Sequence, residues 1–99
     1  MLYIKIFVYI CSVLFNKDKT MLIQYPAGST ETNYTIPDSV ITIGESAFEG
    51  CRSLSSIKMG NRLENIGDYA FGFCTSLTEI SLPDSVKNIG VWAFLHCKS

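Results

Sequence analysis

The sequence predicts an α/β repeat solenoid, in which short strands and short helices recur and successive units stack on one another. Three observations support this fold class: landmark residues return every 23 positions, the hydrophobic pattern changes period within each unit, and a glycine recurs at one place. The recurring sets are Ile43, Ile66 and Ile89; Gly44, Gly67 and Gly90; Ala47, Ala70 and Ala93; Phe48, Phe71 and Phe94; and Cys51, Cys74 and Cys97. A unit this short cannot bury its own apolar face, so neighbouring units must cover one another.

The charge of the chain is nearly balanced, with 8 basic and 9 acidic residues among 99. A nucleic-acid binder or a polybasic membrane anchor would carry a marked excess of positive charge. The composition therefore indicates no nucleic-acid partner, and the length allows one domain at most.

The first residues are strongly apolar and are open to three interpretations. Alternating apolar side chains from Leu2 to Ile10 favour a strand. Lys5 and the apolar run after it would also fit a signal peptide, but residues 16–18 are a poor cleavage site because small residues are required there. The run is too short for a membrane span, which needs about 20 apolar residues. We therefore expect residues 1–12 to be an apolar strand or a ragged start.

Residues 13–33 are predicted to form a hairpin and a loop that cover the first repeat. Val13–Phe15 and Thr20–Tyr25 favour strands, and the polar turn formers of residues 16–19 separate them. Pro26–Ser29 then breaks the pattern, and a polar loop leads into the repeats.

The repeat array is predicted to occupy residues 34–99, with three segments in each unit. Apolar and polar side chains alternate in residues 77–82, which predicts a short strand that ends at Pro83. Residues 86–89 predict a second short strand or an extended edge. Stacked units would place equivalent strands side by side as a parallel sheet.

The third segment of each unit follows the recurring glycine. A glycine at the same place in three units, such as Gly90, implies a corner that needs positive φ or a close backbone approach. Ala93, Phe94 and Cys97 then have helical spacing, as do their counterparts, so we expect one or two turns of helix here.

The three equally spaced cysteines raise the question of a metal site or a disulfide. Zinc sites use pairs of ligands close in sequence, whereas a 23-residue spacing produces a ladder. In-register parallel side chains usually lack the torsion of a disulfide. We therefore expect Cys51 and Cys74 to be buried, reduced and space-filling, and Cys97 to be exposed and oxidisable.

No residue pattern indicates catalysis. His96 is the only histidine and has no matched carboxylate at metal spacing, so we expect it to be solvated. The serines lie outside any nucleophile-elbow motif. Asn33-Tyr34-Thr35 matches the glycosylation acceptor rule, although so short a motif is common by chance. The sequence therefore predicts no enzyme activity, no cofactor and no metal.

One motif resembles a known family. It reads Ile36-Pro37-Asp38-Ser39-Val40-x-x-Ile43-Gly44-x-x-Ala47-Phe48-x-x-Cys51-x-Ser53-Leu54-x-x-Ile57. This motif looks like the repeat of the BspA-like, Treponema pallidum type leucine-rich repeat proteins. It returns from Met59 to Ile80 and, truncated, from Leu82 to Ser99, and residues 13–28 are similar to a hairpin segment commonly found between repeats of that family.

Two departures from the common leucine-rich repeat are visible. The asparagine of that motif is replaced by Arg62 and Ser85, so its buried asparagine ladder is absent. Gly60 replaces the proline of the neighbouring units, which is expected to loosen that corner.

The resemblance implies a non-enzymatic module for protein–protein interaction or cell-surface adhesion. Family members are typically surface or secreted proteins of bacteria and some protists, taken to bind host matrix proteins or other cells. The resemblance thus implies a cell-surface or extracellular location, a protein ligand, and stacking with further repeats of a longer chain. Two alternatives remain: a structural spacer within a larger surface protein, or a scaffold attached to a separate catalytic domain.

The polar side chains that alternate with the apolar ones on the first strand of each unit are the candidate partner-binding face, because solenoids use such extended faces for partners. The candidate residues are Thr35, Ser56, Lys58, Glu79 and Ser81. An ordinary polar sheet face is the alternative, since exposed polar residues need no special explanation.

Overall fold

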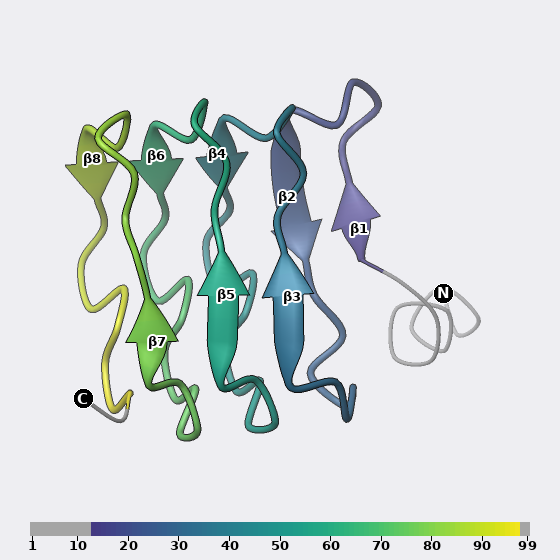
Figure 1. The fold of residues 1–99 in the computed structure, drawn as a ribbon, viewed down its shortest axis with the longest axis vertical. Helices are drawn as coiled ribbons and strands as arrows, with labels where there is room; N and C mark the ends of the chain where they lie inside the picture. Colours follow the sequence, from purple (N-terminus) through teal and green to yellow (C-terminus); the bar gives the residue numbers. More distant parts are fainter. Residues whose placement is uncertain (1–12, 98–99) are drawn as a thin grey trace.

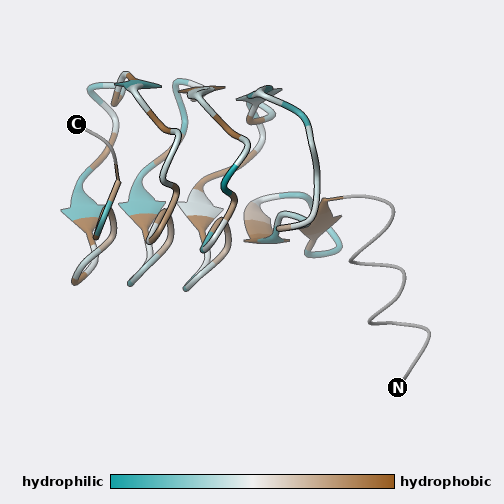
Figure 2. Ribbon diagram, turned by 90° about the horizontal axis from the view of Figure 1, so that it is seen from below, coloured by the Kyte–Doolittle hydropathy of each residue, from teal (hydrophilic) through white to brown (hydrophobic). Residues whose placement is uncertain are grey.

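A computed structural model describes residues 13–97 of the chain. In these residues the backbone winds through successive units that lie side by side, and their strands form two separate layers (Figures 1 and 2). The strand or ragged start predicted for residues 1–12 lies outside the described residues. The division of the chain into residues 1–12, 13–33 and 34–99 stays a prediction.

The first layer is a five-stranded sheet in the order β1-β2-β4-β6-β8. Its strands are β1 (Leu14–Phe15), β2 (Met21–Gln24), β4 (Thr42–Ile43), β6 (Asn65–Ile66) and β8 (Asn88–Ile89). β1 and β2 pair antiparallel, which confirms the predicted hairpin. The other pairs are parallel, and Thr42 lies beside Asn65 and Asn65 beside Asn88. The second strand predicted in each unit is therefore present.

The second layer is a three-stranded parallel sheet in the order β3-β5-β7. Its strands are β3 (Asn33–Thr35), β5 (Ser56–Lys58) and β7 (Glu79–Ile80). Tyr34 lies beside Ile57, and Ile57 lies beside Ile80, so the pairing follows the 23-residue period without slippage. This register confirms the predicted stacking of the repeat units.

The core lies between the two sheets and consists of columns of equivalent side chains. Phe48 and Phe71 are fully buried, and their rings form one column with the half-buried Phe94. The other buried members of the recurring sets are Val40 and Leu63; Ile43 and Ile66; Ala47, Ala70 and Ala93; Cys51 and Cys74; and Leu54 and Leu77. Successive units supply the side chains of each column, so burial depends on having a neighbouring unit.

The prediction of short helices in the third segment of each unit is wrong, because residues 13–97 contain strands and turns and no helix. Alternate N–H groups in these segments bond to the adjacent unit: the N–H of Phe48 donates to the carbonyl of Ala70 at 2.7 Å. The N–H groups between them close turns within their own unit: the N–H of Cys51 donates to the carbonyl of Phe48 at 3.1 Å. A helix would direct every N–H into its own segment, and the bonds between units would then be lost.

The recurring glycines provide a close approach between backbones, which is one of the two roles that the sequence predicts for them. Positive φ is not the reason, since Gly50 is the only glycine with positive φ among the described residues and it lies outside the recurring set. A Cβ on Gly67 would come within 2.8 Å of the Glu45 nitrogen and 2.9 Å of the Gly44 carbonyl carbon. Adjacent units therefore touch through their backbones at this corner.

Candidate functional site

The candidate site is the outward side of the sheet β3-β5-β7, which we call the strand face. Parallel pairing in register places Asn33, Ser56 and Glu79 in one row across the three strands. Thr35 and Lys58 form a second row, and Ser81 follows β7 directly. Because side chains alternate along a strand, these residues lie opposite the core-facing row of Tyr34, Ile57 and Ile80.

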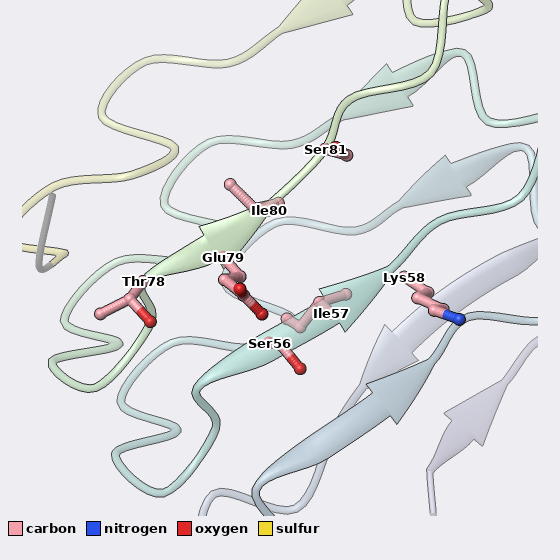
Figure 3. A pocket seen from close by; sticks show the side chains of 7 residues that line it. All are labelled: Ser56, Ile57, Lys58, Thr78, Glu79, Ile80 and Ser81. Atoms are coloured by element: carbon pink, nitrogen blue, oxygen red, sulfur yellow. The ribbon is translucent and has the colours of Figure 1, made fainter.

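An open groove of about 430 Å³ runs over β5 and β7 on this face (Figure 3). Four of the five predicted residues line it, and Thr35 lies beside Lys58 but outside the lining. The lining residues are Ser56, Ile57, Lys58, Thr78, Glu79, Ile80 and Ser81. The structure thus brings the predicted residues onto adjacent strands, and their role in binding stays a proposal.

Two residues of this region were missed by the sequence reasoning, Asn33 and Thr78. The hydroxyl of Ser56 donates to the side-chain oxygen of Asn33, which joins β3 to β5 through side chains. Thr78 lines the groove just before β7. The signal was available in both cases, since Asn33 lies one 23-residue period before Ser56, and Thr78 one period after Ser55.

The groove has one basic and one acidic side chain, Lys58 and Glu79, and both are exposed. Opposite charges on neighbouring strands produce no strong field of one sign, so the groove suits neither a polyanion nor a polycation. The hydroxyl groups of Ser56, Thr78 and Ser81 lie around these charges. Ser56 and Thr78 already donate to Asn33 and to the carbonyl of Ser55, so their oxygens remain as acceptors. Such a mixture of charged and hydroxyl groups is typical of the polar rim of a protein–protein interface.

Tyr34 is an aromatic residue of β3, and it packs against the core rather than lining the groove. Its ring meets that of Tyr25 edge to face with centroids 5.0 Å apart. Burial, and secondarily the proximity of Tyr25, raise the pKa of the Tyr34 hydroxyl. Tyr34 is therefore a structural residue under the strand face.

Cys51, Cys74 and Cys97 form a ladder of free thiols inside the stack. Cys51 and Cys74 are buried and reduced, as predicted. The Sγ of Cys74 donates to the carbonyl oxygen of Phe48 at 3.0 Å, and the Sγ of Cys97 donates to that of Phe71 at 2.9 Å. Cys97 is half-buried rather than exposed, because its thiol also points to a carbonyl inside the stack.

Cys51 and Cys97 are poor nucleophiles in this setting, whereas the hydrogen bond with Cys51 lowers the pKa of Cys74. Contact with the thiol of Cys74, and then burial, raise the pKa of Cys51. Burial also raises the pKa of Cys97. Cys51 and Cys97 therefore stay protonated at neutral pH. They react slowly as nucleophiles, because the thiolate is the reactive form.

Residues 13–97 hold no group of three histidine, cysteine or acidic side chains arranged to bind a metal ion. They also contain no helix that is long and apolar enough to span a membrane. His96 is exposed, as predicted, and its ring lies against that of Phe73 with centroids 5.1 Å apart.

Stacked 23-residue units with short parallel strands and an open polar strand face define a repeat solenoid. A family model described as "BspA type Leucine rich repeat region (6 copies)" matches residues 27–99. The chain belongs to this family, and it is a leucine-rich repeat module.

Solved structures of bacterial leucine-rich repeat proteins are similar to this chain. A leucine-rich repeat protein from Eubacterium ventriosum is 40% identical, with a TM-score of 0.76, over 79% of this chain and 21% of that one. The pneumococcal vaccine antigen PcpA is 32% identical, with a TM-score of 0.74, over 79% of this chain and 25% of that one. A leucine-rich repeat protein of T. pallidum is 26% identical, with a TM-score of 0.73, over 86% of this chain and 42% of that one.

This chain therefore spans between about a fifth and two fifths of the length of these three proteins. No curated protein matches it significantly in sequence.

Proposed function

We propose that this module binds a partner protein through its strand face and contributes to adhesion at the cell surface. The observation that carries the proposal is the groove across β5 and β7, where Lys58, Glu79 and several hydroxyl groups lie together in the open. Exposed rims of mixed charge give a protein interface its specificity and its association rate. A leucine-rich repeat module without a recognised catalytic motif is suited to binding rather than to a reaction.

The cell-surface part of the proposal is supported by the similar proteins. One of them is a pneumococcal protein described as a vaccine antigen, and it shares 32% identity with this chain. The partner would be a host matrix protein or another cell-surface protein.

We propose in addition that a further repeat stacks on the last described unit. Ile89 is 50% exposed, whereas its counterpart Ile66, which has a unit on each side, is 2% exposed. Another repeat in the same register would cover Ile89 as β8 covers Ile66.

The proposal is tested by reversing the charges of the strand face, with Lys58→Glu and Glu79→Lys. Binding to immobilised fibronectin, laminin and collagen would be measured by biolayer interferometry. We expect each reversal to weaken binding by about tenfold, equivalent to about 1.4 kcal/mol. Lys87→Glu is the matched control, because Lys87 is exposed and precedes β8 in the other sheet.

Unchanged affinity after both reversals would remove the strand face as the binding surface. Failure of the unaltered chain to bind any of the matrix or cell-surface proteins would favour the alternative of a structural spacer. A scaffold attached to a catalytic domain would be revealed by such a domain in the same coding sequence.

A further inference from the structure

A second surface of the solenoid has a chemistry different from that of the strand face. It is formed by the segments after β4, β6 and β8, residues 45–50, 68–73 and 91–96, which we call the turn segments. They lie side by side because backbone hydrogen bonds join each to the next, for example from Phe73 to the carbonyl of Leu95 at 2.7 Å. Equivalent side chains of the turn segments therefore form rows on the surface.

Four rings stand in two of these rows, and we call them the aromatic row residues: Tyr69, Phe73, Trp92 and His96. Tyr69 and Trp92 meet edge to face with centroids 5.5 Å apart, and Phe73 and His96 lie 5.1 Å apart. Trp92 is 58% exposed and Phe73 is 37% exposed. Phe73 belongs to a unit with neighbours on both sides, so its exposure does not arise from the end of the stack.

The backbone conformation of these residues argues against a packing role. All four have positive φ, between 54° and 58°, a region that bulky side chains enter at a cost of about 1 to 3 kcal/mol. The first turn segment has Ser46 and Gly50 at the equivalent positions. The first turn segment is thus formed with small residues at these two positions, so the fold does not require large side chains there. The four rings therefore add side-chain surface to the outside of the solenoid rather than contacts to its core.

The charges of the turn segments are of one sign. The three segments contain Glu45, Glu49 and Asp68 and no lysine or arginine, although the chain has 8 basic residues. Glu49 and the ring of Tyr69 both lie close to Gly72: a Cβ placed on Gly72 would be 3.8 Å from Cγ of Glu49 and 3.7 Å from Cδ1 of Tyr69. Exposed aromatic faces beside carboxylates attract a planar cation.

We propose that this surface binds an arginine-rich segment of a second protein. The guanidinium groups stack on the rings of the aromatic row residues and pair with the carboxylates of Glu45 and Glu49. Arginine suits this surface better than lysine, because its planar group stacks on rings and donates in a fork to a carboxylate. The interaction is independent of the strand face, so the module would hold two partners, or two parts of one partner, on different sides.

The test uses the full chain and a defined probe, the peptide acetyl-Gly-Arg-Gly-Arg-Gly-Arg-Gly-amide. Trp92 is the only tryptophan, so its fluorescence reports binding at this surface. We expect the arginine peptide to change the Trp92 emission and to bind about fivefold more tightly than its lysine counterpart. A glutamate counterpart should not bind.

Two double variants locate the site, with affinities measured by isothermal titration calorimetry. Tyr69→Ser with Phe73→Gly introduces the residues of the first turn segment and should weaken arginine-peptide binding by about tenfold. Glu45→Gln with Glu49→Gln keeps side-chain size and should weaken it by about fivefold. Glu79→Gln, on the strand face, is the matched control and should leave the affinity unchanged.

The inference is overturned if the glutamate peptide binds as well as the arginine peptide, or if Glu79→Gln weakens binding as much as the Glu45 and Glu49 pair. Equal affinity of the aromatic double variant and the original chain would also overturn it. If the aromatic variant does not fold, the test rests on the Glu45→Gln, Glu49→Gln variant. That variant should fold, because both substituted side chains are exposed or half-exposed.

Discussion

The rings of Phe48 and Phe71 stack with centroids 4.8 Å apart and planes 16° from parallel, although 23 residues separate them in the chain. The column continues in both directions: Tyr25 stacks on Phe48 at 5.1 Å, and Phe94 stacks on Phe71 at 5.2 Å. Four units of the structure are thus joined by one line of aromatic rings. Phe71 has a ring on each side and is fully buried, whereas Phe94 is half-buried.

We predict that Phe71→Ala destabilises the chain more than Phe94→Ala. Removing a fully buried phenylalanine costs about 3 to 5 kcal/mol, because burial is lost and a cavity is left behind. The cavity at residue 94 would be open on one side and therefore less costly. Thermal melts followed by circular dichroism give the order, and a lower midpoint for Phe94→Ala would contradict the stacking argument.

We predict that Gly67→Ala destabilises the chain while Gly72→Ala is tolerated. A Cβ on Gly67 would meet backbone atoms of the preceding unit at 2.8 to 3.0 Å, and backbone cannot move aside without separating the units. A Cβ on Gly72 would find its nearest neighbour at 3.4 Å, close to ordinary contact. We expect a loss of about 1 to 3 kcal/mol for Gly67→Ala, the usual range for overpacking.

Urea unfolding at neutral pH measures both glycine variants, with Gly72→Ala as the matched control. A similar loss in the two variants would show that the close approach at Gly67 is unimportant for stability.

We predict that the free energy of unfolding falls as the pH rises above about 9. The pKa of Cys51 is raised above its ordinary value of 9.0 by contact with Cys74 and by burial. The unfolded chain therefore loses this proton first and is favoured at high pH, by up to about 1.4 kcal/mol per pH unit for one such group. Below pH 9 the Cys51 thiol is protonated in both states and contributes nothing. The lowered pKa of Cys74 acts in the opposite direction there, because the folded chain loses that proton first.

Urea unfolding at pH 7.5 and pH 10 tests this prediction, and Cys51→Ala serves as the comparison. The variant should lose less stability between the two pH values than the original chain does. An equal loss in both chains would assign the pH dependence to other groups, such as Tyr34, whose pKa is also raised.

Part of the candidate site could be predicted from the repeat alone. Ser56, Lys58 and Glu79 were placed on one face because side chains alternate along a strand and equivalent strands lie in register. Asn33 was missed because it lies in a stretch interpreted as loop, although the same period relates it to Ser56. The groove could not be predicted, since a hollow depends on how far neighbouring side chains extend above the sheet.

The helix prediction failed for a reason that lies outside the segment itself. Ala93, Phe94 and Cys97 have the spacing of a helical face, and nothing local forbids a helix there. In the structure, the N–H of the equivalent residue Phe71 bonds to the carbonyl of Ala93 in the next unit at 2.7 Å. Local spacing carries no information about such a partner.

The sequence by itself determined the length of the repeat unit, the register of the strands and the members of each core column. It could do so because identical spacing leaves one alignment in which like side chains bury one another. The tertiary structure decided the conformation of the turn segments and the exposure of Tyr69, Phe73, Trp92 and His96. These features depend on backbone hydrogen bonds between units, and such bonds exist only once the units have stacked.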